Sequence, residues 1–441
     1  MMSSQLALSS PFAPIALTLF ILFYGLVLLE EKIHLRKSKP VVLGAGILWT
    51  LVAAHATQTG EPEAAIAHLR HYLLEYAELL LFLIVAMAYI STLESRGLFL
   101  KLKSALIRLG LSYRQMFWLL GILAFFISAI ADNLTTALFM SAVAIAIGKD
   151  KPRFIQITCV ALVIAANAGG AFSPFGDLTT LMVWQKGILS FTQFFEIFIP
   201  SVVNFVVPAC CMHFAIPTGK PSTISTAHRV LPGGYPILCL FLLTILCCVL
   251  GHQYLHLPPV IGMMTGLGFL QIYSYFLKKS GNTEPEFDIF QQIQRCEWDT
   301  LLFFYGVILC VGALATFGYL YQVSHFLYTD LGTLFGLSNA HSATPANIFI
   351  GILSALIDNI PVMFSVLTMH PSMSEGQWLL VTLTAGVGGS LLSIGSAAGV
   401  ALMGQAKGIY TFSAHLKWFW AILLGYVASI ATHLLLNQHL F

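Results

Sequence analysis

The residues of this chain that could do chemistry lie in one short motif that occurs twice. The first copy runs from Ser128 to Asn133 and the second from Ser354 to Asn359, and each reads Ser-Ala, two apolar residues, Asp-Asn. Each copy lies inside a long apolar segment, where a carboxylate costs about 2.5–3.5 kcal/mol on insertion scales. A charge kept twice at that cost indicates a site. We therefore predict that the two copies together form one cation site near the middle of a membrane.

The side chains of the two motifs offer only oxygen ligands of use to a cation. Asp132 and Asp358 supply carboxylates, and four neutral side chains add further oxygens: Ser128, Asn133, Ser354 and Asn359. Hard oxygen ligands suit alkali cations and disfavour soft metals. A carboxylate in a low-dielectric site also takes a proton more readily than one in water. Because one group that holds either Na⁺ or H⁺ suffices for exchange, we predict Na⁺ at Asp132, Asn133, Asp358 and Asn359.

A structural ion pair is the alternative interpretation of the two aspartates. No Lys or Arg occurs inside either motif-bearing segment, and Lys186 and Lys407 lie just beyond two glycine-rich breaks in the chain. We therefore expect Asp132 and Asp358 to act in binding rather than in a fixed pair.

The two glycine-rich breaks interrupt apolar segments at residues 167–180 and 386–399. Their composition breaks a helix and frees backbone carbonyls. Five polar candidates lie in the breaks: Asn167, Asp177, Thr179, Ser393 and Ser396. The alternative for the Ser and Thr hydroxyls is a hydrogen bond to a helix carbonyl, and the alternative for Asn167 is a helix cap.

Three further polar residues lie in helices outside the motifs. Glu78 is a candidate proton relay that shares a helical face with Glu75, and an interfacial position is its alternative. Asp299 and Thr300 are candidates for the same relay or for a helix cap.

The composition indicates a membrane protein. Hydrophobic residues make up 58% of the 441 positions and charged residues only 9%, against about 25% charged residues in soluble domains. The net charge of +2 and the lack of a basic, aromatic-rich patch predict no nucleic-acid partner. The eight cysteines lack metal-ligand spacing, and no nucleophile–His–acid set or cofactor motif occurs. We predict neither an enzyme nor a resident cofactor.

Charge also predicts which side of the membrane each connection faces. Short basic segments at 30–39, 96–114 and 149–153 are expected in the cytoplasm, which puts the N-terminus outside. Residues 56–69 and 322–345 lack Lys and Arg and are expected to be external loops.

Residues 115–148 are an apolar run with basic residues at both ends. As one helix this run would be about 51 Å long, too long for a bilayer core of about 30 Å. We therefore predict a re-entrant hairpin, or a pair of helices, with its polar tip at Asp132.

The two halves of the chain match in order and spacing. Gly169, Gly170 and Gly176 each precede a matching glycine by 219 residues. Five crossings plus one hairpin per half is an odd number, which inverts the second half. We predict an all-α polytopic membrane protein with two inverted-topology repeats, about ten spanning helices, two re-entrant hairpins and two unwound helices. The predicted divisions are a first repeat, 1–216 (hairpin 115–148, broken helix 154–190), a cytoplasmic linker, 217–233, and a second repeat, 234–441 (hairpin 346–369, broken helix 376–406).

Three stretches of the chain, 128–133, 167–180 and 388–404, resemble the NhaD-type sodium/proton antiporters of the ion transporter superfamily. The resemblance extends over about residues 70 to 410. It implies a bacterial inner-membrane antiporter that exports Na⁺ or Li⁺ in exchange for H⁺. It also implies a homodimer in the lipid bilayer, with a scaffold and a mobile transport domain in elevator-like motion. The candidates named above, apart from Glu78, match polar positions that this resemblance expects to matter.

A Na⁺-coupled symporter of a dicarboxylate or other small anion, from the same superfamily, is the second hypothesis. Half-helix N-termini could bind the anion. The negative charge of Asp177 in the middle of the first break favours a cation-only site instead. A channel is a weaker third hypothesis, because inverted repeats with midplane breaks are typical of alternating access.

Overall fold

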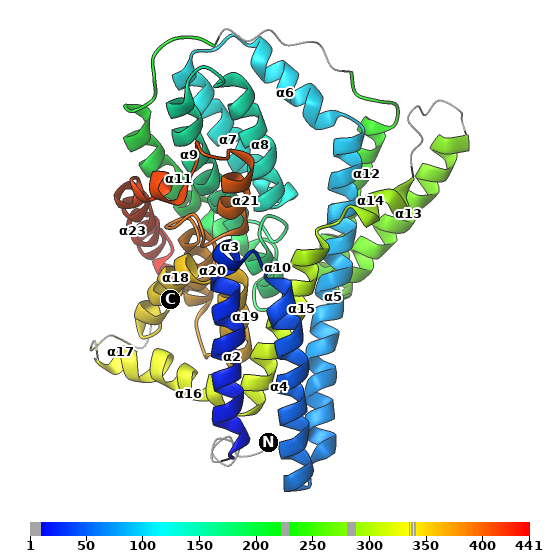
Figure 1. The fold of residues 1–441 in the computed structure, drawn as a ribbon, viewed down its shortest axis with the longest axis vertical. Helices are drawn as coiled ribbons and strands as arrows, with labels where there is room; N and C mark the ends of the chain where they lie inside the picture. Colours follow the sequence, from blue (N-terminus) through cyan, green and yellow to red (C-terminus); the bar gives the residue numbers. More distant parts are fainter. Residues whose placement is uncertain (1–9, 222–228, 280–287, 335, 337, 339–340) are drawn as a thin grey trace.

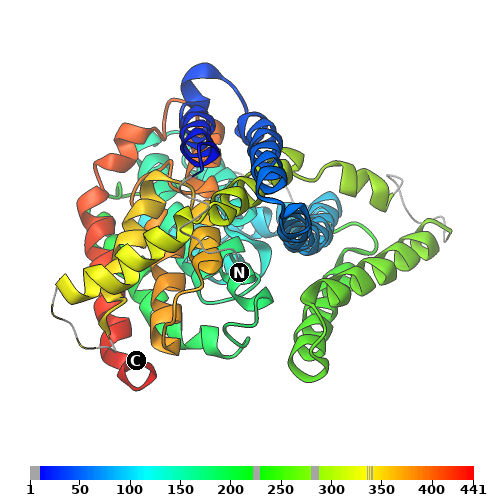
Figure 2. The same ribbon diagram turned by 90° about the horizontal axis from the view of Figure 1, so that it is seen from below.

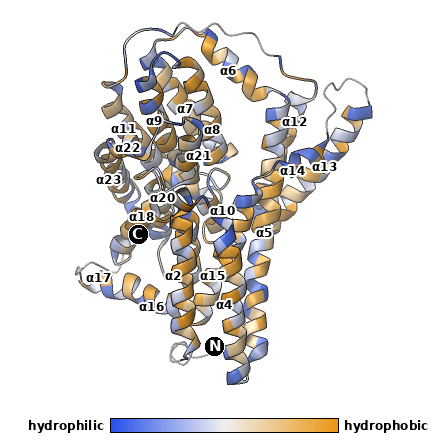
Figure 3. Ribbon diagram, in the orientation of Figure 1, coloured by the Kyte–Doolittle hydropathy of each residue, from blue (hydrophilic) through white to orange (hydrophobic). Residues whose placement is uncertain are grey.

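A computed structural model describes residues 10–221, 229–279, 288–334, 336, 338 and 341–441. Within these ranges the chain is helical and contains no strand. Nine of the described helices are long and apolar enough to cross a membrane, and four apolar helices are shorter. Hydrophobic residues run along most of the helices, and hydrophilic ones gather at the lower ends of α4 and α5 (Figure 3). The predicted class, an all-α polytopic membrane protein, is confirmed.

One group of helices is arranged around the long helix α5, and we call it the α5 group (Figure 1). Figure 2 shows the green α12 and α13 on one side of the blue helices and the remaining bundle on the other. The members of the α5 group are α2 (Phe12–Leu28), α4 (Ser38–Thr59), α5 (Pro62–Ser95), α12 (Gly234–Leu255), α13 (Pro259–Lys279) and α15 (Trp298–Thr316).

The other group contains two helical hairpins, and we call it the hairpin group. In each hairpin two helices meet at an Asp-Asn pair, and both arms of the first hairpin rise to the same end of the molecule (Figure 1). The arms are α7 (Tyr113–Ala131) with α8 (Asn133–Ile147), and α18 (Thr344–Leu356) with α19 (Asn359–Met369).

Two broken helices complete the centre of the hairpin group. The first consists of α9 (Pro152–Ala171) and α10 (Leu178–Gln185), and the second of α20 (Glu375–Gly388) and α21 (Ala397–Gln405). α9 packs against α7, and α20 packs against α18 in the same way. The second pieces cross over, since α10 packs against α19 and α21 against α8. α11 (Phe198–His213) and α23 (Phe419–Leu436) pack on each other beside them.

Glycine and serine hold each hairpin against its broken helix by matched contacts. A Cβ on Gly169 would lie 2.0 Å from the carbonyl oxygen of Phe125, and one on Gly388 would lie 2.0 Å from that of Gly351. Only glycine permits such an approach. The Oγ of Ser128 donates a hydrogen bond to the carbonyl of Ala166 at 2.6 Å. The Oγ of Ser354 likewise donates to the carbonyl of Ala385 at 2.8 Å.

Two segments expected to be external loops are largely helical, which corrects the sequence prediction. α4 ends at Thr59 and α5 begins at Pro62, so residues 56–69 are two helix ends around a turn at Gly60. Within 322–345 the described residues include most of α16 (Tyr319–His325), a π-helical turn (η2, Phe326–Asp330) and α17 (Leu331–Leu334). Missing basic residues carry information about orientation but none about backbone conformation. Part of the predicted linker, 222–228, lies outside the described residues.

Candidate cation site

The carboxylate of Asp177 lies at the centre of a buried polar network between the two hairpins. The residue is 4% exposed, and its Oδ1 accepts a hydrogen bond from the backbone N–H of Thr179 at 3.1 Å. Asn133 Nδ2 donates to Oδ2 of Asp177 at 3.0 Å, and Asn359 Nδ2 donates to the same oxygen at 3.0 Å. The two Asp-Asn motifs therefore meet through their asparagines, on an aspartate from the first break.

Asn167 extends this network toward the second break. Its Oδ1 accepts from Asn133 Nδ2 at 3.1 Å. Its Nδ2 donates to the hydroxyls of Ser390 at 2.9 Å and Ser396 at 3.0 Å. Ser390 was missed by the sequence prediction, although its place directly after the Gly388–Gly389 pair was a usable signal. His415 was missed too: its Nε2 lies 2.8 Å from the Ser390 carbonyl, and no motif marks it.

Asp177 and Ser396 occupy matching places in the two broken helices. Asp177 is the N-cap of α10 with φ −144° and ψ 148°, and Ser396 is the N-cap of α21 with φ −143° and ψ 150°. Each side-chain oxygen accepts from a backbone N–H of its own helix, which is the ordinary role of an N-cap. The same backbone therefore carries a charged group in one half and a neutral one in the other.

A cavity of about 70 Å³ lies beside the network. This is more than the roughly 10–15 Å³ of probe-occupied volume that a single water molecule needs. Its charged lining residues are Lys37, Asp132, Asp177 and Asp358, and Thr300 also lines it. Because three carboxylates face one ammonium group, the cavity favours cations.

Asp132 and Asp358 lie on this cavity but are held differently. Asp132 has φ +58° and caps α8, its Oδ1 accepting from the Thr135 N–H and its Oδ2 from the Thr135 hydroxyl, both at 2.8 Å. Asp358 Oδ2 lies 3.2 Å from Lys37 Nζ. The expectation that no cationic side chain pairs with Asp358 is therefore wrong, because Lys37 reaches it from the distant basic segment 30–39.

Several other predicted residues lie away from the central network. The Ser128 and Ser354 hydroxyls are engaged between helices, and the Ser393 hydroxyl donates to Met403 Sδ at 3.4 Å. Thr179 contributes its backbone N–H. Asp299 lies in the first turn of α15, whose N-cap is Glu297, and accepts from the Ser38 hydroxyl at 2.5 Å. The helix cap considered for Asp299 is thus not formed.

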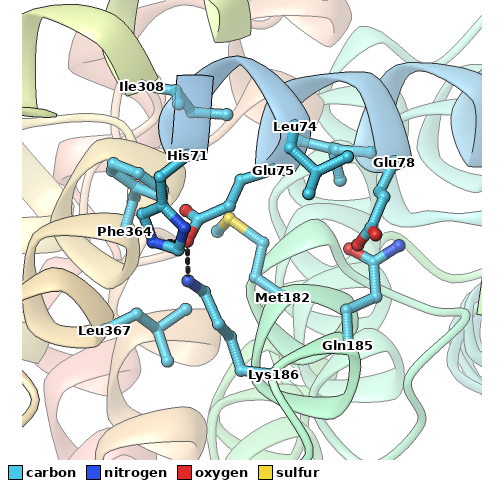
Figure 4. A pocket seen from close by; sticks show the side chains of 11 residues that line it. His71, Leu74, Glu75, Glu78, Met182, Gln185, Lys186, Ile308, Phe364 and Leu367 are labelled. Carbon is cyan, nitrogen blue, oxygen red and sulfur yellow. Dashed lines mark hydrogen bonds and ion pairs between the residues drawn. The ribbon is translucent and has the colours of Figure 1, made fainter. Parts of the chain in front are cut away.

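Glu78 lines a separate pocket of about 300 Å³ between α5 and α10 (Figure 4). There Glu75 is paired with Lys186 and lies 2.7 Å from His71 Nε2, while Glu78 and Gln185 point toward each other. On the opposite side of the central cavity is a pocket of about 590 Å³ lined by Glu94, Arg295 and Glu297.

The three cavities follow one another along α5. Residues 71–79 line the pocket at Glu78, residues 82–90 the central cavity, and residues 87–95 the pocket at Glu94. The central cavity shares Met87 and Ile90 with the pocket at Glu94, and it shares no lining residue with the pocket at Glu78. The central cavity thus has wall residues in common with the pocket at Glu94 and none with the pocket at Glu78.

Known proteins are similar to this chain over most of its length. A family model described as "Citrate transporter" matches residues 12–386. The Na(+)/H(+) antiporter NhaD of Vibrio cholerae is 53% identical over 97% of this chain and 92% of its own length. NhaD of Alkalimonas amylolytica is 51% identical over 97% of this chain and 91% of its own. Sodium/proton antiporter 1 of Arabidopsis thaliana is 30% identical over 95% of this chain and 72% of its own.

Paired hairpins, crossed broken helices and a buried carboxylate between them define a multi-pass membrane transporter. Within that class, the chain belongs to the NhaD family of the ion transporter superfamily. The family resemblance found in the motifs is confirmed.

Proposed function

We propose that this protein exchanges Na⁺ for H⁺ across the membrane, with Asp177 as the carboxylate that binds either ion. The observation that carries the proposal is the meeting of Asn133 and Asn359, one from each hairpin, on Asp177. The antiporter names of relatives 50–53% identical support it.

The network suggests how Na⁺ would be held. Both asparagines now donate N–H groups to an anionic acceptor, and an amide turned by 180° presents its oxygen instead. Na⁺ at Asp177 would then meet carboxylate and amide oxygens, the hard ligands that it prefers. A proton on Asp177 removes the charge that attracts Na⁺. The two ions therefore compete, and each leaves when the other binds.

Several finer features belong to the same proposal. The protein lies in a bacterial inner membrane with its N-terminus outside and residues 217–233 in the cytoplasm, and it also carries Li⁺. It works as a homodimer of two inverted repeats, in which the hairpin group moves against the α5 group. The matched contacts at Gly169 and Gly388 support the repeats. The wall residues Met87 and Ile90, which the central cavity shares with the pocket at Glu94, support access to the site from the side of the basic segments.

Symport of an anion is less well supported. The family model carries the description of a citrate transporter, and Lys37 is a possible anion ligand in the cavity. Its ammonium group is paired with Asp358, however, and two further carboxylates face the same space.

The test is transport in everted membrane vesicles that carry a pH-sensitive dye. Na⁺ and Li⁺ should release accumulated protons from vesicles with the protein, and K⁺ should do so poorly because a small oxygen cage disfavours the larger ion. Vesicles from cells without the protein are the control. Equal responses to the three cations would rule out a dedicated small-cation site. Proton movement that requires citrate together with Na⁺ would establish the symporter instead.

A further inference from the structure

Lys37 brings a positive charge from the α5 group to the tip of the second hairpin. Its Nζ lies 3.2 Å from Asp358 Oδ2 and 4.4 Å from the ring centroid of Phe303. The side chains of Lys37 and Asp358 are 18% and 15% exposed, so water screens the pair only in part. A cation over an aromatic face gains further electrostatic attraction. The ammonium group is therefore held in the cavity.

The backbone at the start of α4 presents Lys37 to the cavity. The N–H of Lys37 donates to Glu30 Oε1 at 3.2 Å, which ties the turn to the first residue of the short helix α3 (Glu30–Ile33). The next residue, Ser38, donates its hydroxyl to Asp299 Oδ1 at 2.5 Å. Two side-chain contacts thus fix the turn on either side of the Lys37 side chain.

The pair with Lys37 engages only one of the two carboxylate oxygens of Asp358. Its Oδ1 is buried and has no hydrogen-bond partner in the part of the chain that the structure describes. A buried carboxylate oxygen without a partner is costly unless something fills the place. The residue also lines the cavity that holds Asp177. A cation entering the cavity would find this oxygen free and Lys37 bound to the other one.

We propose that the Lys37 ammonium is a tethered counter-cation, which binds Asp358 while no transported cation is present and is displaced when Na⁺ enters. This inference rests on the proposed Na⁺/H⁺ exchange. It makes Lys37 a competitor of Na⁺, so the affinity for Na⁺ reflects how tightly Lys37 is held. Because Lys37 belongs to the α5 group and Asp358 to the hairpin group, Na⁺ entry also breaks a contact between the two groups.

The test compares two substitutions that should act in opposite directions. Lys37→Gln removes the competitor, and its apparent KM for Na⁺ should fall by about threefold or more, the scale of one partly screened ion pair. Lys37→Arg offers a forked donor that pairs more firmly with a carboxylate, so its KM should rise. Lys39→Gln, at an exposed position of the same segment, should leave KM unchanged.

Binding and transport are measured separately, so that the two proposals can fail separately. Calorimetric titration of the purified variants with NaCl should give the same order of affinity, Gln above wild type above Arg. If the wild-type protein moves no protons on addition of Na⁺, the proposed exchange is wrong. If it exchanges but KM and Na⁺ affinity are unchanged or shift in one direction in both variants, the role of Lys37 is wrong. If Lys37→Gln does not yield folded protein, the rise expected for Lys37→Arg still decides.

Discussion

Asp177 differs from the other two cavity aspartates in what holds it. Asp132 is satisfied by its own helix through Thr135, and Asp358 is paired with Lys37. Asp177 instead accepts from two side-chain amides on separate hairpins, and these amides can turn to accept a different occupant. At the scale of single residues, the proton and the cation are thus expected to meet at Asp177.

Substitution of Asp177 should therefore stop exchange. Asp177→Asn keeps the size of the side chain but can neither bind nor release the exchanged proton, and Na⁺-driven proton release should be lost at every pH. Asp132→Asn is the matched control, because Asn also serves as an N-cap. It should keep measurable exchange with a raised KM for Na⁺, since one cavity charge is lost. If Asp132→Asn lost transport and Asp177→Asn retained it, Asp132 rather than Asp177 would be the carboxylate that binds the exchanged proton.

The same comparison has a pH dependence with a definite sign. Na⁺ needs the ionised carboxylate, so protons compete with it and the KM for Na⁺ should rise as pH falls. The limit for one competing proton is about tenfold per pH unit. Dye measurements on the wild-type protein across pH give this slope. A KM that stays flat from acid to alkaline pH would contradict a shared carboxylate.

At the scale of elements, the site depends on how closely each hairpin approaches its broken helix. Gly169→Ala would put a methyl group 2.0 Å from the Phe125 carbonyl oxygen, and backbone cannot yield as a side-chain tip can. We expect a lower midpoint of thermal unfolding in detergent, since overpacking typically costs 1–3 kcal/mol. Gly268→Ala is the control, because nothing lies within 4 Å of its added Cβ. Equal midpoints of thermal unfolding for the two variants would show that the contact between Gly169 and Phe125 has room for a methyl group.

The first hairpin also makes a prediction about topology. Its arms end near Ser112 and Gly148, and the rings of Tyr113 and Phe154 lie 4.9 Å apart, so both ends are neighbours. Cysteines introduced at positions 112 and 150 in a cysteine-free background should react with an impermeant thiol reagent only from the cytoplasmic side. Reaction of one of them from outside would mean that the segment crosses the membrane once.

At the scale of the whole molecule, features that depend on local sequence patterns could be predicted, and features that depend on long-range contacts could not. Hydrophobic run lengths gave the membrane class, and glycines placed the breaks between α9 and α10 and between α20 and α21, because both are local properties. The meeting of Asn133 and Asn359 on Asp177 required the crossed packing of both halves. Lys37 could not be assigned, since 321 residues separate it from Asp358 and no pattern links them.

The matched caps Asp177 and Ser396 have a consequence for kinetics. The backbone of the two caps repeats, yet the carboxylate that we propose as the titrating group, Asp177, has a neutral serine as its counterpart. If both caps carried a charge, an ion entering from either face of the membrane would meet the same electrostatic surroundings at the caps. With one charged cap, Na⁺ arriving from the two faces of the membrane meets different electrostatic surroundings. We therefore expect Na⁺ affinity to differ between the forward and reverse half-reactions, with both the Asp177–Ser396 difference and the Lys37–Asp358 pair contributing to that difference.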